Sequence, residues 1–317
     1  MVVGIPRAGM YYRFGVLWKS FLGNLDIEYT VSGETTKAIL ERGSALMADE
    51  SCLASKIYMG HVDSLLDRCD CLFVPWLSNF GADGINCTRF RAYHALISNI
   101  YRDRSPRLLT YAIDYSGTQD MKHAGDEETA FVSMARALGK SKKQLRDAYR
   151  DAKRASDGDF ARRVAQAEEA ASGDGIKILL VGHDYSIYDA YIGRPIVKAF
   201  RSFGMTVIDA NLVDRRQAQR EFLSLSDETL PWIVSRELLG GAAHYRDRAD
   251  GIVLLTGFPC GPDSLVNEVI KREIPEKPIL YLLQDGQDGL AGVETRIESF
   301  ADILTYRGAA AGTENAE

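Results

Sequence analysis

The sequence contains no apolar run long enough to cross a bilayer, for which a helix needs about 20 residues. Its first ten residues, MVVGIPRAGM, lack the charged and then apolar order of a signal peptide. It also has little excess charge of either sign, since 38 basic residues stand against 44 acidic ones for a net charge of -6. We therefore expect a cytoplasmic protein that binds neither membranes nor nucleic acid, because nucleic-acid binding relies on basic surfaces that replace counterions.

Three common chemical signatures are missing as well. The 317-residue chain has no C-x-x-C pair, so a zinc ribbon or ferredoxin-type site is not supported. It has no G-x-x-x-x-G-K-[ST] loop, so ATP hydrolysis would have to come from a partner. It has no G-x-S-x-G motif, which disfavours a serine hydrolase. Five cysteines, an odd number, do not suit a secreted disulfide framework and predict buried thiols, catalytic thiols or metal ligands.

Short apolar runs alternate with amphipathic stretches in both halves of the chain, as in proteins whose crossover helices connect parallel strands. Between the halves, residues 126–171 are rich in Ala, Arg, Lys, Glu and Gln and predict one or two long surface helices. The sequence therefore predicts an α/β fold of two Rossmann-like parallel-sheet domains that face each other, joined by a helical segment. The expected division is an N-terminal α/β domain, a helical connector, a C-terminal α/β domain and a disordered tail, at residues 1–120, 121–175, 176–307 and 308–317.

The expected elements follow from the same patterns. Strands are predicted at residues 2–5, 27–31, 71–75, 108–113, 176–181, 206–208, 251–255 and 278–283. Helices are predicted at residues 11–25, 34–46, 192–203, 230–243, 265–272 and 293–304, with a further helix that begins near Ser51. Ligands of open α/β sheets bind at the carboxyl ends of the strands, so we expect function to concentrate in the loops that follow them.

Three cysteines lie in such loops. Cys52 and Cys260 precede predicted helices, where free backbone N–H groups and the helix dipole stabilise a thiolate, and Cys87 lies in a glycine-containing loop after a strand. They are far apart in the sequence, so only the fold can bring them together, and spacing alone leaves inert cysteines open as an alternative. Cys69 and Cys71, at the start of a core strand, are expected to be buried structural thiols.

Other polar residues near strand ends are candidates for binding or catalysis. His183 and Tyr185 follow the strand at 176–181 and suit hydrogen-bond or proton donation, with ordinary loop packing as the alternative. Arg7 ends the first strand, where it either faces an anionic group or is a solvated turn residue. His61 is expected to be a hydrogen-bonded core histidine, and Asp263 and Ser264 are expected to cap the helix after Pro262.

Several motifs occur together along nearly the whole chain. They are Gly4-Ile5-Pro6-Arg7, Met10-Tyr11, Glu50-Ser51-Cys52, Gly60-His61-Val62, Asn86-Cys87, Gly182-x-x-Tyr185-x-Ile187-Tyr188-Asp189, Cys260-Gly261-Pro262-Asp263-Ser264 and Ala291-Gly292-Val293-Glu294-Thr295-Arg296. In this order they resemble the acyl-CoA dehydratase activase-related domain, a relative of the subunits of 2-hydroxyglutaryl-CoA dehydratase and benzoyl-CoA reductase.

The resemblance implies an oxygen-sensitive [4Fe-4S] cluster that is held by three cysteines in a Rossmann-like protein of anaerobic metabolism, with one iron open to substrate. The matching cysteines are Cys52, Cys87 and Cys260. From their loop positions, Arg7 and Ser264 are the candidates for cofactor binding, Ser264 through a hydrogen bond to a cluster sulfur, and His183 and Tyr185 are the candidates for catalysis. The implied function is low-potential electron transfer or radical chemistry on an acyl-CoA-like substrate, as a lyase (dehydratase) or an oxidoreductase. The implied electron donor is an activator ATPase of the actin and Hsp70 superfamily.

The sequence departs from the family pattern at three places that bear on the substrate. Leu53-Ala54-Ser55 follows Cys52 where relatives tend to have an aromatic residue and a proline, and Thr88 follows Cys87 where proline is frequent. Gln284-Asp285-Gly286 replaces an acidic residue and a histidine. A non-catalytic cluster-binding or assembly subunit and a cofactor-free α/β binding protein remain alternatives. A homodimer or heterodimer is also left open, and a dimer that joined two three-cysteine sites would hold a larger cluster.

Overall fold

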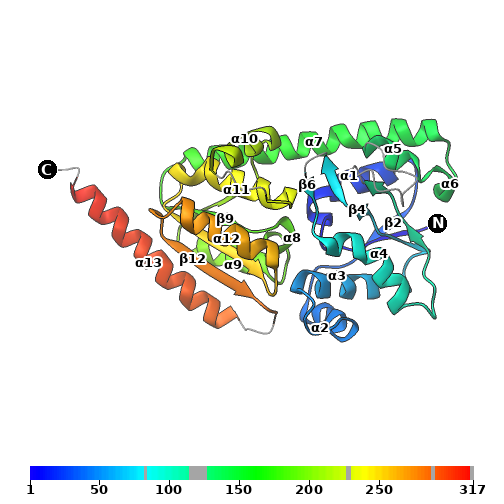
Figure 1. Cartoon of the computed structure of the whole chain (residues 1–317), viewed down its shortest axis with the longest axis horizontal. Helices are drawn as coiled ribbons and strands as arrows, with labels where there is room; N and C mark the ends of the chain where they lie inside the picture. The colour runs from blue at the N-terminus through cyan, green and yellow to red at the C-terminus, as the bar shows by residue number, and fades with distance from the viewer. Residues whose placement is uncertain (82–83, 114–126, 226–229, 287–289, 315–317) are drawn as a thin grey trace. The chain divides into compact units, whose positions relative to one another are not determined.

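The computed structural model describes residues 1–81, 84–113, 127–225, 230–286 and 290–314, and the chain divides into two compact units. Unit 1 comprises Met1–Phe160 and Leu230–Ile233, and unit 2 comprises Ala161–Thr229 and Val234–Glu317. The boundary falls inside helix α7 (Lys142–Ser172). Helix α7, labelled in Figure 1, therefore contributes residues to both units.

Unit 1 is built on a four-stranded parallel sheet in the order β2-β1-β3-β7. Its strands are β1 (Val3–Ile5), β2 (Tyr29–Val31), β3 (Cys71–Phe73) and β7 (Leu108–Leu109). Two small two-stranded sheets pair β4 (Trp76–Leu77) with β8 (Ala112–Ile113), and β5 (Asn79–Gly81) with β6 (Gly84–Ile85). Its helices are α1 (Tyr11–Asn24), α2 (Lys37–Leu46), α3 (Leu53–Asp63), α4 (Thr88–Ile100), α5 (Glu127–Val132) and α6 (Ala135–Leu138), with the first part of α7.

The core of unit 1 is rich in aromatic side chains. Helix α1 buries Phe14, Trp18 and Phe21, whose spacing of three and four residues places them on one face. The Phe21 ring meets the Phe131 ring edge to face with centroids 4.8 Å apart. Trp18 donates a 2.9 Å hydrogen bond from Nε1 to the Tyr111 hydroxyl inside this core. Its polar group is therefore satisfied without contact with water.

Unit 2 repeats the same architecture with a parallel sheet in the order β10-β9-β11-β12. Its strands are β9 (Lys177–Val181), β10 (Thr206–Asp209), β11 (Gly251–Gly257) and β12 (Ile279–Gln284). Its helices are α8 (Asp184–Ile187), α9 (Gly193–Ser202), α10 (Arg215–Leu225), α11 (Ile233–Tyr245), α12 (Gly261–Glu273) and α13 (Leu290–Glu314), with a short 3-10 helix at Arg246–Arg248.

The central strands of the sheet in unit 2 are buried on both faces. On one face, Leu180, Val253 and Leu282 form a core cluster with Phe200 of α9 and Ile297 of α13. Because successive strand residues point to opposite faces, the buried neighbours of these strand residues face the other side, where α11 and α12 bury their own apolar residues. Burial on both faces explains why β9 and β11 read as continuous apolar runs in the sequence, whereas Tyr281 and Leu283 of the edge strand β12 are exposed.

The structure confirms the predicted α/β class with parallel sheets and corrects several elements. The strand predicted at 108–113 is two short strands, β7 and β8, and the helices α4 and α10 were not predicted. The expected disordered tail is wrong for residues 308–314, because α13 continues to Glu314. In the described part of the chain, no helix combines the length and the apolar character needed to span a membrane.

Candidate functional site

The strand order places the reversal of connectivity at the same point in both units. In unit 1 the chain moves from β1 outward to β2 and then back past β1 to β3, and in unit 2 it moves likewise from β9 to β10 and back to β11. Loops that follow the two central strands diverge there and leave a crevice, which is where open α/β sheets bind ligands. A ligand of either unit is therefore expected to bind at the residues that follow β9 and β11, or β1 and β3.

In unit 2, the loops after these two strands carry the sequence-predicted residues His183 and Cys260. His183 lies two residues after β9 at the start of α8, and Cys260 follows β11 at the N-cap position of α12. Strands β9 and β11 are hydrogen-bonded neighbours, with Val181 opposite Leu254. Parallel neighbours end at the same edge of a sheet, so the two loops meet there.

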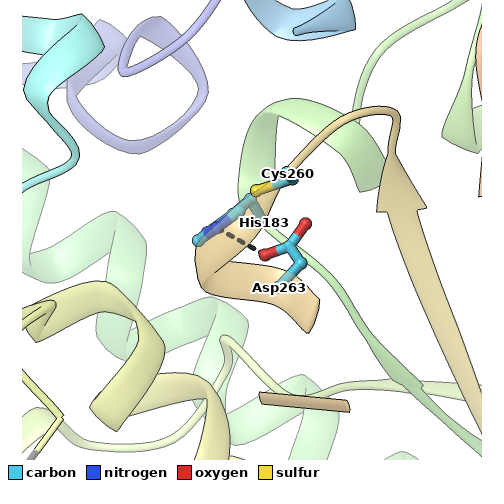
Figure 2. A group of neighbouring side chains, drawn as sticks. All are labelled: His183, Cys260 and Asp263. Carbon is cyan, nitrogen blue, oxygen red and sulfur yellow. Dashed lines mark ion pairs between the residues drawn. The ribbon is translucent and has the colours of Figure 1, made fainter. Parts of the chain in front are cut away.

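His183, Cys260 and Asp263 form a compact polar group at this edge (Figure 2). One ligand atom from each residue lies within 4.8 Å of the other two. His183 Nε2 and Asp263 Oδ1 are 2.8 Å apart, and their side chains are only 8% and 5% exposed, whereas Cys260 is half-buried. Asp263 Oδ2 is also buried and has no hydrogen-bond partner among the described residues. The group combines the three side-chain types that most often bind transition metals.

Two sequence predictions about the α12 start are corrected here. Asp263 was expected to cap the helix, but its carboxylate faces His183, and the N-cap makes no side-chain capping bond. The Ser264 hydroxyl donates a 2.9 Å hydrogen bond to the backbone carbonyl of Cys260, and Ser264 is exposed. Ser264 therefore holds the turn that carries Cys260. Tyr185 stacks on the His183 ring with centroids 4.8 Å apart.

A second polar group, which sequence reasoning missed, lies at the end of β10. The Tyr188 hydroxyl donates a short hydrogen bond to Asp209, and Asn211 donates to Asp209 Oδ1 at 2.7 Å and to the Gly182 carbonyl at 2.8 Å. Burial, and next the nearby charge of Asp184, raises the pKa of Asp209 to about 6. An aspartate at the end of a strand, followed by Asn211, was the signal available in the sequence.

In unit 1, Cys52 and Cys87 occupy the N-cap positions of α3 and α4. The Cys52 sulfur and the Ser55 hydroxyl are 3.2 Å apart, and Ser55 in turn contacts the Tyr93 hydroxyl at 3.4 Å. The pKa of Tyr93 is raised well above its usual value by burial and then by the nearby charges of the Cys52 and Cys87 thiolates. Tyr93 is therefore close enough to both cysteines for their charges to raise its pKa.

An apolar cavity adjoins Tyr93 at the carboxyl ends of β1 and β3. Its volume is about 20 Å³, and it is lined by Pro6, Ala8, Met10, Trp18, Tyr58, Phe73, Pro75, Leu77, Phe90 and Tyr93. A cavity of this size holds about one water-sized molecule. The Tyr58 and Tyr93 rings stack at 3.9 Å along one wall, which keeps the aromatic surface rigid.

Comparison with known protein families assigns this chain to one family. The family model described as "CoA enzyme activase uncharacterised domain (DUF2229)" matches residues 2–213, well over half of the chain. The chain belongs to this family. The matched residues of the CoA enzyme activase domain include Cys52, Cys87 and His183, while Cys260 and Asp263 lie beyond them.

Other comparisons add little to the family assignment. No curated protein matches this CoA enzyme activase domain. The solved structure of the SBP FpvC from Pseudomonas aeruginosa in complex with Mn2+ is 14% identical, covers 96% of this chain and 95% of its own, and has a TM-score of 0.28. The crystal structure of ZnuA is 10% identical over 96% and 98% of the two chains, also with a TM-score of 0.28. Likenesses this weak support no inference about function.

The remaining sequence-predicted residues of this CoA enzyme activase domain lie in unit 1. Arg7 follows β1, its guanidinium lies 3.8 Å from the Glu34 carboxylate, and its backbone N–H donates to the Ser32 hydroxyl at 2.7 Å. His61 is fully buried and contacts the hydroxyls of Ser32 and Thr35. His61 is therefore the hydrogen-bonded core histidine that the sequence predicted.

The five cysteines of the chain fall into three settings. Burial raises the pKa of the Cys69 and Cys71 thiols. Cys71 is buried in the core strand β3 as expected, whereas Cys69 is only half-buried. Cys52 and Cys87 share the surroundings of Tyr93 in unit 1, and Cys260 lies beside His183 and Asp263 in unit 2. A single site built from Cys52, Cys87 and Cys260 stays a prediction.

Proposed function

We propose that this protein binds an iron-sulfur cluster through Cys52, Cys87 and Cys260. It would use the cluster for low-potential electron transfer or reductive chemistry on an acyl-CoA-like or other small substrate. The chain belongs to a family described as a CoA enzyme activase domain, and this supports a role in acyl-CoA metabolism. The sequence resemblance to 2-hydroxyacyl-CoA dehydratase components supports the choice of cofactor.

The observation that carries the proposal is the position shared by the three cysteines. Each is the N-cap residue of a helix, and none of the three uses its side chain as a capping group. The free N–H groups and the positive end of the helix dipole favour a negative sulfur at this position. A thiolate is the form of cysteine that binds iron, so the local structure suits the donor set that a cluster needs.

Cys52 and Cys87 also suit a shared cofactor because they lie around one side chain. Both influence Tyr93, which is buried and keeps its proton. The Tyr93 hydroxyl contacts Ser55, and the Ser55 hydroxyl contacts Cys52 Sγ, so these neutral groups provide hydrogen bonding beside the sulfur without adding charge. The half-buried state of both cysteines leaves the thiols accessible to incoming metal.

When bound, a [4Fe-4S] cluster would supply one-electron chemistry at low potential. Because the chain lacks a P-loop, the electron donor would be an ATP-dependent activator of the actin and Hsp70 superfamily. His183 and Tyr185, stacked at the edge of the sheet in unit 2, are the side chains we assign to hydrogen bonding or proton transfer. The alternative is a non-catalytic cluster-binding or assembly subunit with the same ligands.

Anaerobic reconstitution of the full-length protein with iron and sulfide tests the proposal. We expect a brown protein with about four iron atoms per chain. The single variants Cys52→Ser, Cys87→Ser and Cys260→Ser should each lose most of this iron and colour. Cys69→Ser is the matched control, because Cys69 is a half-buried thiol that caps no helix, and it should reconstitute like the wild type.

A colourless wild-type protein, or equal loss of iron in Cys69→Ser, would overturn the assignment of these ligands. Turnover of acyl-CoA substrates by the reconstituted protein with a low-potential reductant supports a catalyst. A stable cluster without turnover supports the accessory subunit.

A further inference from the structure

We propose that His183, Cys260 and Asp263 form a binding site for one divalent transition-metal ion, Zn2+ or Fe2+, within unit 2. This inference goes beyond the proposed function, because the site needs neither Cys52 nor Cys87. Cys260 serves one metal site at a time, so the single-ion site belongs to the protein without its cluster. The two proposals share Cys260 but differ in their other ligands, so variants of Cys52 and Cys87 test the cluster and variants of His183 and Asp263 test the single-ion site.

The donor set fits such an ion. Imidazole nitrogen, thiolate sulfur and carboxylate oxygen are the three protein donors found in zinc sites, and ferrous iron accepts the same ligands. Three protein ligands are typical of zinc sites that keep a fourth position for water or a small oxygen or sulfur ligand. Cys260 is half-buried while His183 and Asp263 are buried, so that fourth position would open on the Cys260 side of the group.

The distances also fit. With metal–ligand bonds of about 2.0 to 2.3 Å, donor atoms of a tetrahedral site lie about 3.3 to 3.8 Å apart. Here one donor pair, His183 and Asp263, is separated by 2.8 Å, and no pair exceeds 4.8 Å. Small side-chain movements on metal binding would lengthen the distance between His183 and Asp263 and shorten the longest distance between donor atoms. Figure 2 shows the Cys260 sulfur and an Asp263 oxygen both close to the His183 ring.

The second, independent observation is the buried carboxylate oxygen. Asp263 is 4% exposed, and its Oδ2 atom has no hydrogen-bond partner among the described residues. Burying a carboxylate oxygen without a partner costs free energy, because the oxygen loses water and gains nothing in return. A divalent cation held between Asp263, His183 and Cys260 would supply the missing positive charge.

Neighbouring residues hold the ligands in place. Asn211 donates from Nδ2 to the Gly182 carbonyl, directly before His183, and the Ser264 hydroxyl holds the Cys260 carbonyl. Tyr185 stacks on the imidazole ring. Supporting contacts of this kind orient metal ligands and are expected around a site that binds tightly. The ligands also come from the loops after two neighbouring central strands, which is the usual place for a ligand in this fold.

Titration of the reduced, metal-free, full-length protein with Co2+ tests the site. We expect one Co2+ per chain, with the visible bands of tetrahedral cobalt and a thiolate-to-cobalt charge-transfer band, both abolished by added Zn2+. His183→Gln and Asp263→Asn should weaken Co2+ binding by at least about tenfold, which is the smallest loss typical even of supporting residues. Cys260→Ser should abolish the charge-transfer band.

The controls separate this site from the cluster. Cys52→Ser and Cys87→Ser should bind Co2+ like the wild type although they are expected to lose the cluster. His183→Cys, which keeps a metal ligand at this position, should retain binding and gain charge-transfer intensity, so that a general folding defect of His183→Gln is recognised.

Unchanged binding by both His183→Gln and Asp263→Asn, or loss of binding in Cys52→Ser, would overturn the single-ion site. Failure of cluster reconstitution with intact Co2+ binding would overturn the proposed function alone.

Discussion

His61 carries two hydrogen bonds in a fully buried position, and this has a consequence for stability against acid. Its Nδ1 lies 2.8 Å from the Ser32 hydroxyl and its Nε2 lies 2.9 Å from the Thr35 hydroxyl. A hydroxyl both donates and accepts, so a neutral ring is satisfied on both sides. Burial, and next the charge of Arg7, lowers the pKa of His61 from 6.5 to about 4.

Because the folded state disfavours the charged ring, the unfolded chain binds a proton at higher pH than the folded one. The stabilisation is present above pH 6.5 and is lost as the pH falls toward 4. We expect His61 to lower the free energy of unfolding by up to about 3 kcal/mol across this window, at about 1.4 kcal/mol per pKa unit. Urea unfolding at pH 7 and pH 4.5 measures this change in the free energy of unfolding. The decrease between the two pH values should be smaller for His61→Gln than for the wild type. An identical decrease in both proteins would refute the assignment.

A second prediction at the residue scale concerns the hydrogen bond between Trp18 and Tyr111. Both side chains are buried, and Tyr111→Phe removes the acceptor while leaving the Trp18 N–H in place. An unpaired buried donor costs about 1 to 3 kcal/mol, so the free energy of unfolding should fall by that amount. Tyr306→Phe is the matched control, since Tyr306 is 79% exposed and its loss should leave stability unchanged. Equal stability of both variants would mean that the bond contributes nothing.

Helices α2 and α3 approach so closely that glycine is required on both. A Cβ atom on Gly43 would lie 1.7 Å from the Lys56 carbonyl oxygen, and one on Gly60 would lie 1.9 Å from that of Ile39. Helix α11 repeats this arrangement with Gly240 against Ala218. Such contacts are backbone to backbone, so no side-chain rotation relieves them.

We therefore predict that Gly43→Ala lowers the free energy of unfolding by about 1 to 3 kcal/mol or more, because the two helices must separate. Gly158→Ala in α7 is the control, since nothing lies within 4 Å of the added methyl group. It should stabilise the protein by about 0.5 to 1 kcal/mol, through the lower entropy of the unfolded chain and the better helix propensity of alanine. Denaturant unfolding distinguishes the two, and a stabilising Gly43→Ala would contradict the close approach.

Sequence patterns located most elements because strongly apolar strands and long amphipathic helices are local signals. Helix α10 was missed because its sequence, RRQAQREFLSL, is mostly polar, and it buries only Ala218, Phe222 and Leu225. Helix α4 buries Phe90, Tyr93 and Ile97 among polar residues, so the sequence after Cys87 carries only a weak helix signal. Short helices of this kind are stabilised by tertiary packing more than by propensity.

The division of the whole chain into two units with separate sheets has consequences for unfolding. Each unit buries its own core, so we expect unfolding by heat to depart from a single two-state transition. Zn2+ at a concentration about 100 times its dissociation constant should stabilise unit 2 by about 2.7 kcal/mol through the proposed site. Calorimetry should therefore show two unfolding transitions, and Zn2+ should raise the midpoint temperature of only one of them.

Variants in each unit identify the transitions. Gly43 lies in unit 1, so Gly43→Ala should lower the temperature of the transition that Zn2+ does not shift. His183→Gln lies in unit 2 and should remove the Zn2+ effect. If there is a single transition, and both Gly43→Ala and Zn2+ change its midpoint temperature, the chain unfolds as one cooperative body.

The sequence by itself determined the α/β class, the parallel order of strands and helices, and the placement of Cys52 and Cys260 at helix starts. These depend on apolar periodicity and on the residues that flank each helix, which act over a few positions. It also identified His183 and Cys260 one by one. Only the tertiary structure decided that they form one group with Asp263, because strands β9 and β11 are hydrogen-bonded neighbours although β10 and several helices separate them along the chain. The local sequence also could not predict the direction of the Asp263 side chain. Asp263 faces His183 and does not cap α12, because the loop after the neighbouring strand β9 places His183 beside it.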